Sequence, residues 1–412
     1  MTPASSTGFD EEPALARCVD EVADFFDVDW GRRARICLGP ERTGFEDLLT
    51  LDGVDRALTT TALRTPFFRL VRAGEHIAPS AYTRAGRAGS RPVAGIVDPV
   101  AVASLFEQGA TIVLQAMHRW SEPVARFCRD LEVELGFPCQ VNAYVTPAGA
   151  QGLELHHDPH DVFVLQAFGR KRWEVHAAPG EAPRAPWGAE VGAGDTIYMP
   201  TGTPHAASAQ DQVSGHLTVG VHVAGWRDAV AGAWSSVLEH EPSLAEALPA
   251  GWHRRDPDEL AKELGERLHA LADRLLDVDG AGLMQQRADR FLSARGPSAR
   301  GTIVDRAAPP IVDDNSVVAR RPGAICVMRL TEGSLVLLLG DRRMRMPEWL
   351  EPAVRRLADD RPARVGDLAD VVPDPGSRLV LVRRLIAEGL LRAEPVAGRD
   401  PARSSDPGFG DG

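Results

Sequence analysis

Residues 153–173, LELHHDPHDVFVLQAFGRKRW, carry the side chains of this chain that are best suited to chemistry. Three histidines and two aspartates lie within the six positions of HHDPHD. We expect a β-strand here, and alternate residues of a strand face the same side. His156 and Asp158 would then project together, while His157 faces the other way. One imidazole and one carboxylate on one face would supply two ligands of a metal site.

A third ligand must come from elsewhere, and His205 in GDTIYMPTGTPH is the best candidate. Gly194 and Asp195 predict a turn, TIYM a strand, and the prolines and glycine of PTGTPH a stiff loop that presents the histidine. Two histidines and one carboxylate leave coordination positions open, as in non-haem Fe(II) oxygenases. The competing interpretation is that all three are ordinary, hydrogen-bonded loop residues.

Other histidines crowd the same segment, so a different trio is conceivable. His216 and His222 share one parity of a predicted strand and could line the same cavity. Pro159 breaks the regular extension next to His160 and Asp161. We interpret the remaining candidates as supporting, substrate-facing or structural residues: His157, His160, His176, His216 and His222.

Lys171 is a candidate anchor for a small carboxylate. DVFVLQAF and KRWEVH predict a hairpin that returns Lys171 to the level of the metal ligands. Its parity with Trp173 turns it inward, and a cation in an apolar interior is costly unless an anion joins it. Only Lys171 and Lys262 are lysines among 46 basic residues. Asn142 and Tyr144 could add hydrogen bonds to the acid. The alternative is a surface lysine and two ordinary polar strand residues.

The composition excludes several classes of protein. The chain has 412 residues, 44% hydrophobic and 25% charged, and no apolar run long enough to span a bilayer. Five cysteines without a CxxC spacing argue against disulfides and a cysteine zinc site, and predict buried thiols. A net charge of −12 argues against general binding to nucleic acid. The N-terminus does not resemble a signal peptide, which predicts a cytoplasmic protein.

The order of strand-like and helix-like runs along the sequence predicts an α+β chain of several regions. Short strand-like runs in 91–225 are typical of an antiparallel barrel or sandwich. YTRAGRAGSRPVAG, from residue 82, reads as a connector before it. A leucine stripe in the second helical region could pack on the barrel or form a dimer face. The predicted regions are 1–90, mixed and mostly helical; 91–225, the catalytic barrel; 226–297, helical; 298–322, a connector; 323–396, winged-helix-like; and 397–412, a disordered tail.

The last ordered region has only a weak positive charge. Residues 342–393 contain 11 Arg against 8 Asp and Glu. An excess of this size does not establish DNA binding.

Several motifs together resemble the JmjC-type cupin oxygenases, particularly the ribosomal oxygenase group. The resemblance rests on GATIVLQAMHRW, NAYVTPAGAQGL, HHD, DVFVLQAFGRKRWEV and GDTIYMPTGTPHAA, and on the order of barrel, helical region and winged helix. It covers about residues 60 to 395. One departure concerns the strand after the distal histidine, where HLTVG offers Thr218 and then Gly220 in place of a small hydroxyl residue late in that strand.

The resemblance implies a double-stranded β-helix dioxygenase that binds Fe(II), 2-oxoglutarate and dioxygen and hydroxylates a protein or peptide side chain. By motif position, His156, Asp158 and His205 match the iron ligands and Lys171 the residue that holds the 2-oxoglutarate carboxylate. Asn142 and Tyr144 match polar residues near the cosubstrate. In that group the helical region mediates dimerisation, and the winged helix is a structural module.

Two other functions stay open from the sequence. One is a hydroxylase of a small molecule or peptide natural product, which would use the same iron chemistry. The other is a non-catalytic metal-binding cupin whose winged helix binds DNA.

Overall fold

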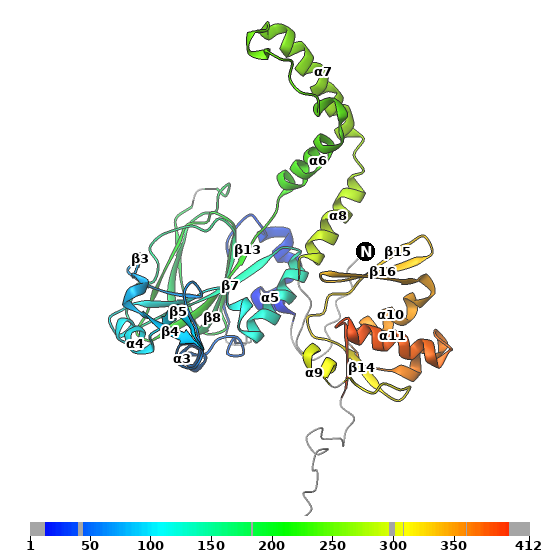
Figure 1. The fold of residues 1–412 in the computed structure, drawn as a ribbon. Coiled ribbons are helices and arrows are strands. Elements are labelled where there is room, and N and C mark those ends of the chain that lie inside the picture. Colours follow the sequence, from blue (N-terminus) through cyan, green and yellow to red (C-terminus); the bar gives the residue numbers. More distant parts are fainter. Residues whose placement is uncertain are drawn as a thin grey trace, which may run out of the picture. The chain divides into compact units, whose positions relative to one another are not determined.

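The computed structural model describes residues 13–39, 44–182, 184–295, 301–307, 309–359 and 361–394. These residues form two compact units, one within Glu12–Trp226 and the other within Arg227–Gly412. Both combine helices with antiparallel sheets (Figure 1). None of the helices described is both long and apolar enough to cross a membrane.

The first unit is built on an eight-stranded sheet and a three-stranded sheet. The larger sheet has the order β1-β11-β8-β13-β7-β6-β2-β3 and the smaller the order β10-β9-β12. The larger sheet consists of β1 (Arg35–Cys37), β2 (Phe68–Arg72), β3 (Glu75–His76), β6 (Thr111–Leu114), β7 (Cys139–Thr146), β8 (Asp161–Phe168), β11 (Thr196–Met199) and β13 (Ser214–Val221). The smaller consists of β9 (Lys171–Val175), β10 (Trp187–Val191) and β12 (His205–Ala209).

The two faces of the larger sheet have different neighbours because strand residues alternate between faces. On one face, Val141, Phe163 and Leu217 pack with the helices of this unit in the main core. On the other, Val162 and Val164 of β8 pack against Trp173 and Val175 of β9. The two sheets therefore lie face to face, and Tyr144 and Thr146 of β7 and His216 and Thr218 of β13 line a pocket between them.

Helices and a hairpin complete the first unit. The helical segments are α1 (Ala14–Cys18), α2 (Val22–Asp24), η1 (Phe25–Asp29), α3 (Leu51–Thr60), η2 (Pro79–Ala81), α4 (Pro99–Glu107), η3 (Met117–Arg119) and α5 (Glu122–Leu135). Side chains cap two of them: Thr50 accepts from the Gly53 amide at α3, and Asp98 from the Ala101 amide at α4.

The region 1–90, which we expected to be mixed and mostly helical, contributes β1, β2 and β3 to the larger sheet besides its helical segments. One expectation for the start of the chain is wrong. The predicted connector at 82–95 forms a hairpin of β4 (Thr83–Ala88) and β5 (Arg91–Val97). Its Gly and Arg residues suggested a linker, but Gly89, with φ +60°, makes the tight turn of a hairpin.

The second unit begins with helices and ends in a small mixed domain. The helical segments are α6 (Trp226–His240), η4 (Pro242–Leu244), η5 (Trp252–Arg254), α7 (Pro257–Leu276), α8 (Gly280–Ser293) and α9 (Thr302–Ala307). Several large apolar side chains of this stretch are exposed, including Leu264 and Leu268 of the predicted leucine stripe, whereas Leu271 is buried.

The mixed domain has two three-stranded sheets around a core of its own. Val318, Leu337, Val354 and Leu385 belong to this core. The sheets are β18-β14-β19 and β15-β16-β17. The elements are β14 (Val317–Arg320), β15 (Val327–Thr331), β16 (Ser334–Leu339), β17 (Arg342–Pro347), η6 (Glu348–Leu350), α10 (Glu351–Ala358), β18 (Ala363–Arg364), η7 (Val365–Asp370), α11 (Pro375–Ala387) and β19 (Leu391–Ala393). The predicted tail, 397–412, lies outside the described residues.

Candidate functional site

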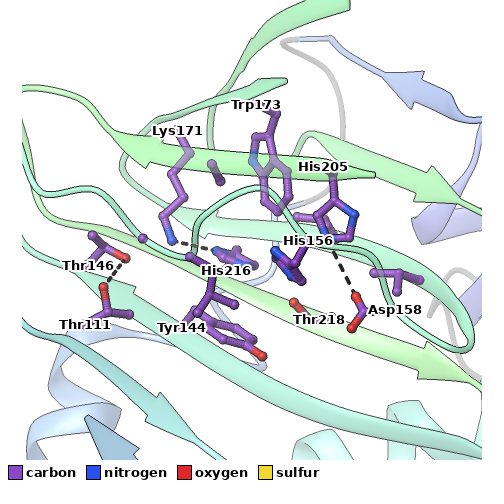
Figure 2. A pocket seen from close by; sticks show the side chains of 15 residues that line it. Thr111, Tyr144, Thr146, His156, Asp158, Lys171, Trp173, His205, His216 and Thr218 are labelled. Carbon is purple, nitrogen blue, oxygen red and sulfur yellow. Dashed lines mark hydrogen bonds and ion pairs between the residues drawn. The ribbon is translucent and has the colours of Figure 1, made fainter. Parts of the chain in front are cut away.

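The structure brings His156, Asp158 and His205 together. One ligand atom from each lies within 4.8 Å of the other two. His205 Nε2 is 3.6 Å from Asp158 Oδ2, and the two imidazole rings are 4.4 Å apart between centroids (Figure 2). Two imidazoles and a carboxylate at this separation can share one metal ion.

A backbone carbonyl two residues earlier in the chain orients each of the two histidines. His156 Nδ1–H donates to the Glu154 carbonyl at 2.7 Å, and His205 Nδ1–H to the Thr203 carbonyl at 2.9 Å. A carbonyl oxygen only accepts, so the proton of each neutral ring lies on Nδ1. Each Nε2 therefore keeps a lone pair for a metal, and burial also lowers the pKa of His205.

The HxD segment is not the regular strand that we predicted. His156 makes only an isolated antiparallel bridge with His205, in which the two amides donate to the two carbonyls at 3.1 and 2.8 Å. β8 begins later, at Asp161. Pro159 has no N–H to continue a ladder, which explains why pairing stops before it. The bridge still fixes two of the three candidate ligands directly opposite each other.

A short loop, residues 200–204, presents His205, and Asp161 holds that loop. Asp161 accepts hydrogen bonds from the Thr201 amide at 2.8 Å, the Thr201 hydroxyl at 2.7 Å and the Tyr198 hydroxyl at 2.5 Å. The Gly202 amide donates to the Asp158 carbonyl at 2.9 Å. The second aspartate of HHDPHD therefore supports the site without being one of its candidate ligands.

Lys171 is buried, with 2% of its surface exposed, whereas Arg172 faces solvent. The predicted hairpin is wrong, because β8 and β9 belong to different sheets. Both edges of β8 are already paired, with β11 and β13, so the chain crosses to the facing sheet at Gly169. This glycine has φ +67°, and a Cβ there would meet the Val213 carbonyl oxygen. The crossing aims Lys171 at the larger sheet.

The ammonium of Lys171 donates to His216 Nδ1 at 2.8 Å. Burial lowers the pKa of Lys171 to about 7. Burial, and next the charge of Lys171, hold the pKa of His216 well below its usual value, so this imidazole is neutral. His216 stacks on Tyr144, with centroids 5.1 Å apart and planes 7° apart, and burial raises the pKa of that phenol.

One pocket connects these groups. Figure 2 shows Lys171 at one end and the His156, Asp158 and His205 cluster at the other. The residues that line it are Thr111, Tyr144, Thr146, Gly152, Leu153, His156, Asp158, Val162, Val164, Lys171, Trp173, His205, Ala207, His216 and Thr218. A metal at one end and a cation at the other suit a small acid that chelates through one end and carries a second carboxylate.

Asn142 is placed differently from the other candidates, since it does not line this pocket. Its side-chain oxygen accepts a hydrogen bond from the Ala116 amide at 2.9 Å. Ala116 has a left-handed backbone, with φ +50°. Asn142 therefore braces the turn after β6.

Of the remaining histidines considered in the sequence analysis, His216 alone lines the pocket. His222, which shares its strand parity, packs with His160 at 5.2 Å and is not part of the lining. His157 is exposed, and His176 pairs with Glu174. Strand parity was the signal for His216 and Trp173, but it did not reveal which residues they contact across the sheets.

Part of this chain is similar to known proteins. Residues 114–189 match the family model of the JmjC domain. The "Bifunctional lysine-specific demethylase and histidyl-hydroxylase NO66" of Dictyostelium discoideum is 27% identical over 287 residues, 62% of this chain and 54% of that protein. "Ribosomal oxygenase 2" of Rattus norvegicus is 30% identical over 195 residues, 41% of each chain. The chain thus spans about half or less of these relatives.

Solved structures show the same fold. The structure of YcfD, a ribosomal oxygenase from Escherichia coli, in complex with cobalt and 2-oxoglutarate, matches with a TM-score of 0.51 and 19% identity. The match covers 91% of this chain and 98% of that one. The predicted resemblance to the JmjC and ribosomal oxygenases is confirmed, and the fold is that of the JmjC cupins, with helices added to the sheets.

Proposed function

We propose that this protein is an Fe(II)- and 2-oxoglutarate-dependent dioxygenase that hydroxylates a side chain of a ribosomal protein. The observation that carries the proposal is one pocket with a His-Asp-His cluster at one end and a buried lysine at the other. Relatives named as ribosomal oxygenases, and a YcfD structure that holds cobalt and 2-oxoglutarate, support it.

The donor set suits Fe(II). His156 and His205 would bind through Nε2 and Asp158 through its carboxylate, which leaves coordination positions open for the acid and dioxygen. Bound together, Fe(II) and 2-oxoglutarate supply the oxidation: dioxygen places one atom in a substrate C–H bond and the other in succinate, with release of CO₂. Structural zinc sites rarely keep open positions, which favours a catalytic metal here.

The chain itself supplies binding and orientation. Lys171 would hold the distal carboxylate, while His216 keeps the ammonium in place. Tyr144 stacks on His216 in the pocket wall, and Asn142 accepts a hydrogen bond from the Ala116 amide and so braces the turn after β6. The apolar side chains of Val162 and Val164 exclude water from the path between the metal and the cation.

The finer features of the fold are part of the proposal. The facing sheets would form a double-stranded β-helix, and the domain of β14, α10, η7, α11 and β19 a winged helix that serves as a structural module. The exposed apolar residues of α6 support a homodimer formed through the helical region. A ribosomal substrate would place the protein in the cytoplasm.

Mass spectrometry of ribosomal proteins tests the substrate. Ribosomes from cells that express the chain should contain a protein heavier by one oxygen atom, and this product should be absent from cells that express His205→Ala. Turnover of 2-oxoglutarate without any oxygenated protein would favour a small-molecule substrate instead.

A further inference from the structure

The indole N–H of Trp173 is a polar group that the pocket leaves without a partner. Trp173 is 4% exposed, and its Nε1 is buried without a hydrogen-bond partner among the residues that the structure describes. A buried indole N–H normally finds an acceptor, and unpartnered buried donors are rare in native proteins. The side chain lines the same pocket as Lys171 and His216. Its position therefore points to a ligand that accepts the hydrogen bond.

Within the described part of the chain, no side chain accepts a hydrogen bond from Trp173. On the neighbouring strands, Ala189 of β10 and Ala207 of β12 lie opposite it in register. Across the gap between the sheets, Val162 and Val164 pack against it. The imidazole of His216 lies 5.3 Å from the indole centroid at 76°, and its Nδ1 is already used by Lys171.

Trp173 and Lys171 face the same pocket. They are two residues apart on β9 and project from the same face, which places their Cα atoms about 7 Å apart. Figure 2 shows the indole between Lys171 and His205. A carboxylate has two oxygens with about four acceptor positions, more than one ammonium that already donates to His216 can fill. A second donor beside Lys171 would complete the site.

We propose that the Trp173 indole N–H donates a hydrogen bond to the distal carboxylate of the acid held by Lys171. Trp173 is then a binding residue that helps the pocket select a dicarboxylate. This inference rests on the proposed function, and it names a contact that the metal cluster and Lys171 do not provide.

The test compares two acids of equal length in protein loaded with Mn(II). 2-Oxoglutarate carries the distal carboxylate, and 2-oxopentanoate ends in a methyl group instead. Calorimetric titration of Trp173→Phe should show affinity for 2-oxoglutarate reduced about tenfold, as expected for a lost hydrogen bond to a charged group. Affinity for 2-oxopentanoate should stay unchanged. Trp187→Phe, on the neighbouring strand and outside this pocket, is the matched control and should bind both acids normally.

Three results separate the explanations. Unchanged affinity of Trp173→Phe for 2-oxoglutarate overturns the inference alone, and equal weakening for both acids shows that the ring only supports the metal end. Failure of the wild type to bind 2-oxoglutarate overturns the proposed function with it.

A second measurement uses wild-type protein, so it does not depend on whether Trp173→Phe folds. In wild-type protein loaded with Zn(II) and labelled with ¹⁵N-tryptophan, one of the eight indole N–H signals should move downfield with 2-oxoglutarate and not with 2-oxopentanoate. If no signal does so, the inference is wrong.

Discussion

Lys171 is the residue whose protonation state determines how the pocket binds an acid. It is a buried cation whose contact is a neutral imidazole, and no carboxylate among the described residues lies within ion-pair distance of it. Its hydrogen-bond partner His216 is neutral, and so are Tyr144 and the hydrogen-bonded Thr111–Thr146 pair, which line the same pocket (Figure 2). A buried ammonium without an anion is costly, which favours the binding of an acid.

The lowered pKa of Lys171 predicts how cosubstrate binding depends on pH. Below a pH of about 7 the free protein already carries the ammonium that an acid requires. Above it the lysine must take up a proton on binding, so affinity for 2-oxoglutarate should fall by up to about tenfold per pH unit. Calorimetry of Mn(II)-loaded protein from about pH 6 to about pH 9 measures this slope.

Two comparisons control the pH experiment. 2-Oxopentanoate, which has no distal carboxylate, should not show the slope. The affinity of Lys171→Arg for 2-oxoglutarate should also not fall with rising pH, because a guanidinium stays charged over this range. A wild-type affinity that is constant above neutral pH would contradict the role given to Lys171.

At the scale of single residues, the sequence could reveal the groups but not all of their contacts. Spacing and residue type placed His156, Asp158, His205 and Lys171 in one hypothesis, and the structure brings them to one pocket. The contact between Lys171 and His216 joins two sheets, β9 to β13, and no spacing within either strand predicts it. The unpartnered N–H of Trp173 depends in the same way on what faces it.

At the scale of elements, the connection between β8 and β9 explains why these residues meet. A two-residue turn with glycine is typical of a hairpin, but here it carries the chain from one sheet to the other. The strands themselves were predictable: QVNAYVT and KRWEV alternate between buried and less buried residues, DVFVLQAF and TIYM are short apolar runs, and all four form strands. Sequence alone does not show which edges of a strand are already occupied, and this decides between a hairpin and a crossing.

The loop that presents His205 depends on Asp161. Asp161→Ala should lower the free energy of unfolding of the first unit by about 3 kcal/mol, because it leaves the Tyr198 and Thr201 donors without their acceptor. Metal affinity should fall about tenfold, since the loop no longer fixes His205. Denaturant unfolding and a Mn(II) titration measure the two effects.

Thr201→Ala is the matched control for this prediction. It removes one side-chain hydrogen bond to Asp161 and leaves the Thr201 amide bond in place. Its effects should be clearly smaller in both measurements. Full metal affinity in Asp161→Ala would show that the loop holds its shape without the carboxylate.

At the scale of the whole molecule, the residues of the pocket all belong to the first unit, while α6, which begins at the last residue of that unit and continues in the second, carries an exposed apolar stripe. On α6, Trp226 and Val230 are 80% and 64% exposed, and Trp234 and Leu238 follow at the same spacing. Residues four apart lie on one helix face, so these side chains form a continuous surface. Large exposed apolar patches mark interaction sites.

The proposed homodimer gives a clear expectation for this stripe. Wild-type protein should sediment as a dimer, and the double variant Trp226→Glu with Val230→Glu as a monomer, because buried carboxylates would oppose association. Leu330→Glu, an exposed apolar position on β15, is the control and should remain dimeric. A monomeric wild type in sedimentation velocity would refute the dimer.

The central claim is that His156, Asp158 and His205 hold one catalytic iron, and anaerobic reconstitution tests it most directly. Wild-type protein with Fe(II) and 2-oxoglutarate should form succinate when oxygen is admitted, and so should His157→Ala, which removes the exposed neighbouring histidine. His156→Ala should lose succinate formation, since the cluster then has two ligands. If His156→Ala forms succinate at the wild-type rate, or if wild-type protein forms none, the account is contradicted.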